Sequence, residues 1–215
     1  MIDSLQRHEL LCVRPEGWRR ALALCPEIAA REHVADWVSR GWPVMVRRFL
    51  PADQPELIPV AISLPPSSAR SGIALQLLPQ DIGQRLPAVP LKECVELAPA
   101  PWRQALRSLL DLGERLDAPP AVFGSLLWQK LTGLSYLHEC SDLDLIWRVK
   151  HSRQALALAH AMAAIAAHSP MALDGEFLLP DGAGVQWREF LDGAQQVIVK
   201  TLHRAESRAF ETLAC

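Results

Sequence analysis

Residues 121–125 read Ala-Val-Phe-Gly-Ser, and residues 141–146 read Ser-Asp-Leu-Asp-Leu-Ile. The first stretch is a short apolar run that ends in glycine and serine, which predicts a strand that turns into a helix. The second stretch alternates acidic and apolar residues, which predicts a strand with one face toward a core. Because side chains alternate along a strand, Asp142 and Asp144 share the opposite face.

Two carboxylates on one face of a strand bring like charges close together. Their Cα atoms are about 6–7 Å apart at the usual rise per residue, and the proximity opposes joint ionisation. A hard divalent cation removes this conflict, and carboxylate oxygens suit Mg²⁺. Such an ion keeps coordination positions for substrate phosphates. We therefore predict that Asp142 and Asp144 are catalytic and that they hold Mg²⁺.

The turn before this strand has features of a phosphate-binding site. Gly124 allows close approach of the backbone, and a helix that starts here offers free N–H groups. Ser125 adds a hydroxyl, and Lys130 lies in the following turns. Arg47 and Arg48 end an apolar strand and are further candidates for substrate binding, with a surface salt bridge as the alternative. Adjacent strand residues face opposite ways, so at most one of the two arginines faces a given phosphate.

A third carboxylate commonly completes a two-metal site. Residues 171–177 read Met-Ala-Leu-Asp-Gly-Glu-Phe and predict a strand in which Asp174 and Glu176 share a face. The alternative is that both are surface charges of a hairpin. Of the two, we prefer Glu176 as the third metal ligand, because the glycine beside it permits close packing.

The rest of the chain predicts an α+β fold in two domains. Prolines recur where periodicity is weak, at positions 79, 87, 90, 99 and 101, and predict a boundary that gives domains 1–98 and 99–215. The remaining elements are predicted from apolar periodicity. Helices are expected at 27–40, 102–116, 126–131 and 154–167, and strands at 43–49, 57–64, 73–78, 171–179, 184–191 and 197–199.

Composition narrows the possible partners and location. Half of the 215 residues are hydrophobic, which is enough for a sizeable core, and the net charge of −2 does not favour a nucleic-acid groove or an anionic membrane surface. The five cysteines form no Cys-x-x-Cys pair, which argues against disulfides and a cysteine zinc site. No stretch is apolar for long enough to span a bilayer. We expect a cytoplasmic protein without nucleic-acid or membrane partners.

The order of Gly-Ser turn, helix, Asp-x-Asp strand and later acidic strand resembles the nucleotidyltransferase superfamily of the polymerase β type. The chain also resembles a narrower family, the holo-acyl-carrier-protein synthases of malonate decarboxylase, also called phosphoribosyl-dephospho-CoA transferases. The similarity spans nearly the whole chain, and a Trp-Gln-x-Leu-Thr-Gly run joined to Ser-Asp-Leu-Asp is specific to it. The stretches that carry it are 7–11, 43–48, 124–134, 141–145, 180–182 and 185–189.

This resemblance implies a fold, a reaction and partners. It implies a small N-terminal α+β domain, with carrier recognition as a possible role, followed by a polymerase-β-like domain in which a mixed sheet packs on helices. The implied enzyme transfers phosphoribosyl-dephospho-CoA from 2′-(5″-triphosphoribosyl)-3′-dephospho-CoA to a serine of the acyl-carrier subunit of malonate decarboxylase and releases pyrophosphate. The family's paired aspartates correspond to Asp142 and Asp144. A nucleotidyltransferase with another acceptor and a non-catalytic assembly factor are the alternatives.

Overall fold

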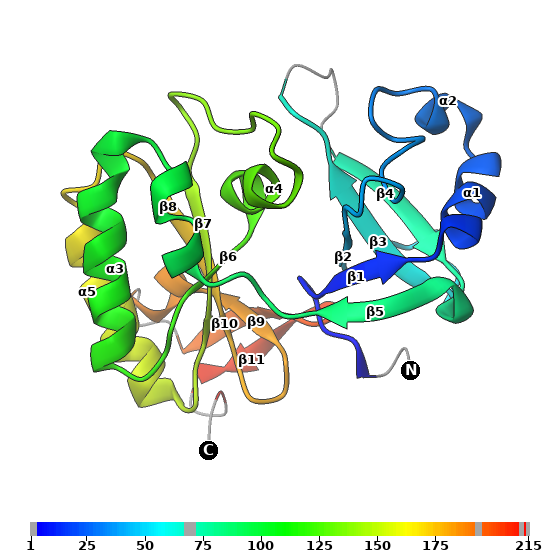
Figure 1. Cartoon of the computed structure of the whole chain (residues 1–215). Helices are drawn as coiled ribbons and strands as arrows, with labels where there is room; N and C mark the ends of the chain where they lie inside the picture. The colour runs from blue at the N-terminus through cyan, green and yellow to red at the C-terminus, as the bar shows by residue number, and fades with distance from the viewer. Residues whose placement is uncertain (1–3, 67–71, 192–194, 211–212, 214–215) are drawn as a thin grey trace. The chain divides into compact units, whose positions relative to one another are not determined.

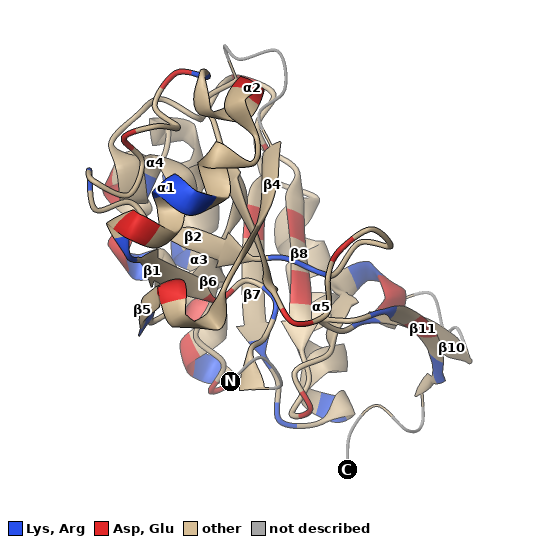
Figure 2. Ribbon diagram, turned by 90° about the vertical axis from the view of Figure 1, so that its right-hand side faces the viewer, with Lys and Arg blue, Asp and Glu red and all other residues tan. Residues whose placement is uncertain are grey.

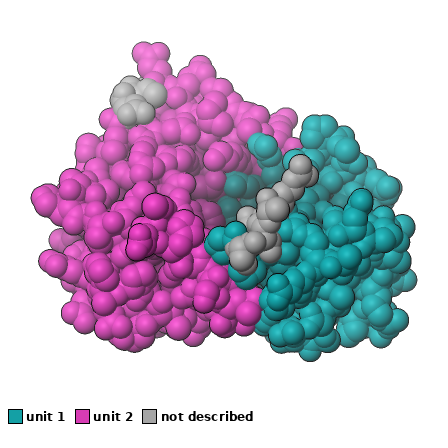
Figure 3. Space-filling model, turned by 90° about the horizontal axis from the view of Figure 1, so that it is seen from above, with its two compact units in different colours: residues 1–88 teal, residues 89–215 magenta. Residues whose placement is uncertain are grey.

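A computed structural model describes residues 4–66, 72–191, 195–210 and 213. The chain forms two compact units, 1–88 and 89–215, which Figure 3 colours separately. The sequence predicted the division at 98/99. Residues 89–98 belong to the second unit because its strands hold them: the Val122 N–H donates to the Val89 carbonyl, and the Leu91 N–H donates to the Pro120 carbonyl. Within the described ranges, no helix combines the length and apolar character needed to cross a membrane.

The first unit is built on an antiparallel sheet of five strands in the order β4-β3-β2-β1-β5 (Figure 1). Its strands are β1 (Leu10–Val13), β2 (Val44–Val46), β3 (Ile58–Ser63), β4 (Gly72–Leu77) and β5 (Ile82–Leu86). Its helices are α1 (Pro15–Ala23), α2 (Pro26–Ala29) and the 3₁₀ turn η2 (Pro79–Asp81). β4 alternates exposed and buried residues, which fits a sheet with one face on the core.

The helix predicted over 27–40 is wrong beyond its first turn. Only α2 is helical, and the chain continues in turns to position 41. His33 adopts a positive φ of 67°, a conformation that a right-handed helix cannot include. The apolar periodicity was real nevertheless, since Val34 and Trp37 are completely buried. The Trp37 indole N–H donates to the Pro43 carbonyl at 2.9 Å, which holds the turns without a helix.

The second unit is built on a six-stranded sheet in the order β11-β10-β9-β8-β7-β6. Its strands are β6 (Ala121–Val122), β7 (Leu143–Arg148), β8 (Leu173–Leu178), β9 (Gly184–Gln186), β10 (Gln196–Lys200) and β11 (Ala205–Ala209). β7 and β8 are parallel, and the other pairs are antiparallel, so the sheet is mixed as predicted. β11 was not predicted, and the second hairpin strand ends at Gln186 instead of continuing to 191.

Helices pack against this sheet. They are α3 (Arg103–Arg115), α4 (Gly124–Thr132) and α5 (Ser152–Ala166), with the 3₁₀ turns η3 (Leu91–Glu93), η4 (Val95–Leu97), η5 (Ala100–Trp102) and η6 (Trp187–Phe190). α3 and α5 lie side by side along one face of the sheet (Figure 1). Leu143, Leu145 and Trp147 are completely buried on β7, so the alternation turns the acidic residues to the opposite face. The predicted α+β class, with a mixed sheet packed on helices, is confirmed.

Candidate active site

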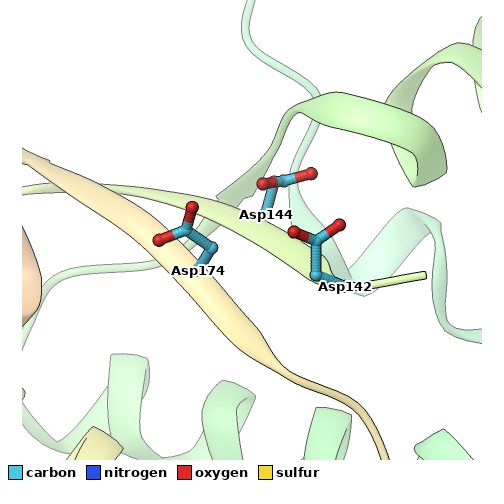
Figure 4. A group of neighbouring side chains, drawn as sticks. All are labelled: Asp142, Asp144 and Asp174. Atoms are coloured by element: carbon cyan, nitrogen blue, oxygen red, sulfur yellow. The ribbon is translucent and has the colours of Figure 1, made fainter. Parts of the chain in front are cut away.

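Three carboxylates meet on β7 and β8 at the end where both strands begin. The parallel register places Asp144 opposite Asp174, and Asp142 immediately precedes β7. One oxygen from each of Asp142, Asp144 and Asp174 lies within 4.8 Å of the others. Figure 4 shows the three side chains on the same side of the two neighbouring strands, and Figure 2 marks acidic residues in red along β8. We call these three residues the acidic group.

The loop before β7 positions Asp142. Ser141 is buried, and its hydroxyl accepts a hydrogen bond from the His138 N–H at 3.0 Å. The Ser141 N–H in turn donates to the His138 carbonyl, also at 3.0 Å. This reciprocal pair closes a turn, so the strand begins at a defined residue with Asp142 exposed at its start. His138 closes this turn through its backbone, and its Nδ1 atom accepts a hydrogen bond from the Cys140 N–H at 3.3 Å.

Gly124 starts α4 directly against Asp144. Its φ is +62°, and a Cβ atom at this position would overlap the Asp144 carboxylate. The Phe123 N–H donates to the Asp144 carbonyl at 3.1 Å, which ties the turn to β7. Ser125 follows in the first turn of the helix and is half-buried. The structure thus brings the Gly-Ser turn and the acidic strand together, as the sequence predicted.

The electrostatics of the acidic group are unfavourable without a cation. The pKa of Asp144 is raised from 3.8 to about 7, chiefly by burial and then by the nearby charges of Asp142 and Asp174. A buried carboxylate with two acidic neighbours favours either a proton or a bound positive ion.

Asp174 is oriented by three donors. Its Oδ1 atom accepts hydrogen bonds from the Gly175 N–H at 2.9 Å and from the Gln186 side-chain amide at 3.0 Å. The Arg188 guanidinium adds a longer contact at 3.4 Å. Together these contacts fix the rotation of the carboxylate toward the rest of the acidic group. The stretch 185–189 carried the family resemblance, but residue types alone did not connect it with Asp174.

Glu176, which the sequence favoured as the third ligand, lies outside the acidic group. It is opposite Ile146 in the parallel register, one step along the face from Asp174, and it is buried with its Oε1 atom 3.3 Å from the Lys200 ammonium. Gly175, which suggested Glu176 as the ligand, has a different role. A Cβ at Gly175 would collide with the Leu145 carbonyl, so this glycine allows β7 and β8 to pair. The geometry favours Asp174 over Glu176 as the third metal ligand.

The remaining candidates lie in different places. Lys130 is exposed in the last turn of α4, about 9 Å along the helix axis from Gly124. Burial raises the pKa of the Cys94 thiol to about 11, and the positive charge of Lys130 acts in the opposite direction. Within the first unit, Arg47 makes two hydrogen bonds to Asp53, at 2.5 and 2.9 Å.

That contact is a salt bridge, but not the surface salt bridge that the sequence offered as the alternative to substrate binding. Both side chains of the pair are largely buried. Arg48 is exposed, and its carbonyl accepts a hydrogen bond from Arg47. Substrate binding by Arg47, Arg48 and Lys130 stays a prediction.

Comparisons with known proteins define the class of this enzyme. Two family models match, the phosphoribosyl-dephospho-CoA transferase MdcG N-terminal domain over residues 6–88 and the corresponding C-terminal domain over residues 90–209. The protein is therefore a transferase. It belongs to the phosphoribosyl-dephospho-CoA transferase family, so the resemblance seen in the sequence is confirmed.

Relatives of the same name support this assignment. A phosphoribosyl-dephospho-CoA transferase of Xanthomonas campestris pv. campestris (strain 8004) is 36% identical over 90% of this chain and 89% of its own length. One from Bradyrhizobium diazoefficiens is 35% identical over 92% of this chain and 87% of its own, and one from Pseudomonas aeruginosa is 30% identical over 79% and 80%. No solved structure matches, so the likeness to the polymerase β type stays a prediction.

Proposed function

We propose that this protein transfers phosphoribosyl-dephospho-CoA from 2′-(5″-triphosphoribosyl)-3′-dephospho-CoA to a serine of the acyl-carrier subunit of malonate decarboxylase and releases pyrophosphate. The observation that carries the proposal is the acidic group beside the Gly-Ser start of α4, in a member of this transferase family. A cytoplasmic location follows from the reducing environment that the cysteine content indicates. The described cysteines, Cys12, Cys25, Cys94 and Cys140, are all free thiols.

The residues of the acidic group fit a hard divalent cation. They offer three carboxylate oxygens within 4.8 Å of one another, and burial, with the charges of Asp142 and Asp174, raises the pKa of Asp144. We propose that Asp142, Asp144 and Asp174 hold Mg²⁺. When bound, Mg²⁺ would supply Lewis-acid stabilisation of charge on the phosphate oxygens.

The chemistry needs no nucleophile from this chain. The Oγ atom of the carrier serine forms a bond to the α-phosphorus of the donor, and the bond from that phosphorus to the bridging oxygen of the β-phosphate breaks. Pyrophosphate leaves with the bond's electron pair, and the hydroxyl proton passes to a carboxylate of the acidic group. The product is a phosphodiester on the carrier. The N–H groups at Gly124 and Ser125 would orient the donor's phosphates at the start of α4.

The test is transfer to the purified apo carrier subunit. With the triphosphate donor and Mg²⁺, intact-mass spectrometry should show one added phosphoribosyl-dephospho-CoA group, and the pyrophosphate released should equal the carrier modified. Asp142→Asn should abolish both signals, and so should a chelator. An unmodified carrier in the presence of folded wild-type enzyme would refute the proposal. Full transfer by Asp142→Asn would instead favour a chemistry outside the acidic group.

We also propose that the first unit recognises the carrier, because the second unit already contains the acidic group and the Gly-Ser turn. Amide hydrogen exchange on the full chain, with and without the apo carrier, tests this idea. Protection should appear within residues 1–88. Protection confined to residues 89–215 would contradict it.

A further inference from the structure

Arg188 is a cation that stands beside the acidic group and that the proposed chemistry has not yet used. It lies in η6, immediately after β9. β9 pairs with β8 so that Gln186 is opposite Glu176, which brings the following turn alongside the start of β8. The turn is rigidly held, because Trp187 and Phe190 are buried in the core.

The guanidinium of Arg188 is held from three sides. It lies 4.5 Å from the centre of the Trp187 ring, it donates to the Leu173 carbonyl, and its Nη1 atom is 3.4 Å from the Oδ1 of Asp174. The Arg188 backbone N–H also donates to the Gln186 side chain at 2.6 Å. Nearly half of the arginine side chain is nevertheless exposed, at 47%. The group is therefore positioned in advance and still accessible to a ligand.

The contact with Asp174 is weak enough to be exchanged. An ion pair between half-exposed side chains is screened by water and contributes little. The Oδ1 atom already accepts two shorter hydrogen bonds, from the Gly175 N–H and the Gln186 amide, so Asp174 keeps its orientation when Arg188 leaves it. A guanidinium presents a planar fork of donors that matches phosphate oxygens better than an ammonium does.

We infer that Arg188 binds the phosphate groups of the donor beside the acidic group, exchanging its contact with Asp174 for phosphate oxygens. This inference rests on the proposed function, since it assumes that the acidic group is where the donor's phosphates bind. The inference also predicts that pyrophosphate and Mg²⁺ affect each other's binding. A cation beside a metal site repels the metal until a polyphosphate arrives, so pyrophosphate and Mg²⁺ should bind better together than either does alone.

The test uses pyrophosphate as the probe, with the full-length protein and isothermal titration calorimetry in Mg²⁺. Arg188→Gln should weaken pyrophosphate binding about tenfold or more, because one charged hydrogen-bonding group is lost. Arg188→Lys should give an intermediate loss, since the charge stays but the fork does not. The matched control is Arg107→Gln, which removes the same charge from an exposed position on α3 and should leave the affinity within twofold. Circular dichroism checks that each variant folds.

A second measurement separates phosphate binding from mere support of Asp174. Mg²⁺ is titrated without pyrophosphate. If Arg188 binds phosphate, Arg188→Gln leaves Mg²⁺ affinity unchanged or raises it, because a repelling charge is gone. If Arg188 only supports Asp174, the variant loses Mg²⁺ affinity and keeps its pyrophosphate affinity once Mg²⁺ is saturating. That second pattern would overturn the inference.

The outcomes also distinguish this inference from the proposed function. Wild-type protein that binds pyrophosphate with Mg²⁺, while Arg188→Gln binds it equally well, refutes the role of Arg188 alone. Loss of binding in Arg188→Gln with no transfer by wild-type enzyme to the carrier supports Arg188 and refutes the proposed acceptor. Wild-type protein that does not bind pyrophosphate in Mg²⁺ refutes the phosphate site beside the acidic group and the role of Arg188, while the carrier-mass assay still decides the proposed function.

Discussion

Replacing Asp144 with asparagine should stabilise the metal-free protein at alkaline pH. The pKa of this carboxyl is raised from 3.8 to about 7, chiefly by burial and then by Asp142 and Asp174. The folded state therefore binds the proton more tightly than the unfolded state does. The stability that this group contributes is fully present below about pH 4, and it is lost as the pH rises toward 7. Asparagine cannot ionise, so the variant protein should lack this contribution to the pH dependence of stability.

The magnitude follows from the two pKa values. At about 1.4 kcal/mol for each tenfold change in proton affinity, the difference between 3.8 and about 7 corresponds to at most about 4 kcal/mol. Relaxation of the site and penetration by water reduce this value. We expect the metal-free Asp144→Asn protein to exceed wild type by about 1–4 kcal/mol at pH 8 and to match it near pH 4.

The assay is urea unfolding in a chelator at pH 4, 6 and 8, followed by far-ultraviolet circular dichroism. Saturating Mg²⁺ at pH 8 should reverse the order, because the ion stabilises wild type and binds the variant poorly. The matched control is Asp111→Asn, a carboxylate change at an exposed position on α3. It keeps Asp144, so its stability relative to wild type should be the same at all three pH values. A variant that is less stable than wild type at pH 8 in chelator would refute the electrostatic reasoning.

Three further substitutions test the packing around the site and within the first unit. Gly124→Ala should cost about 1–2 kcal/mol for its positive φ and lower transfer at least about tenfold, because its methyl group displaces Asp144; thermal denaturation and the carrier-mass assay measure these effects. Asp174→Asn should reduce Mg²⁺-dependent transfer by about a hundredfold or more with little change in melting temperature, and normal activity in this variant would exclude it as a ligand. Arg47→Gln should destabilise the protein by about 2 kcal/mol in urea, because Asp53 loses the hydrogen bonds that lower its pKa; an unchanged midpoint would show that the pair is dispensable.

Periodicity predicted most of the sheet and helices of the second unit, because those patterns are local. The alternation in 141–146 placed β7, and the apolar stripe of 102–116 placed α3. The same reasoning failed at 27–40, where buried apolar residues recur at helical spacing but His33 turns the backbone out of the helix. A buried set of turns and an amphipathic helix can share one apolar pattern, and only the backbone distinguishes them.

The sequence by itself determined that Asp142 and Asp144 project together, since one strand carries both, and that a glycine and serine precede them at the start of a helix. It also determined the family. Only the tertiary structure decided that Asp174 joins them and that Glu176 pairs with Lys200. The reason is physical: the third carboxylate and Arg188 reach the site through pairing between distant strands, and register between distant strands is set by packing that no local pattern encodes.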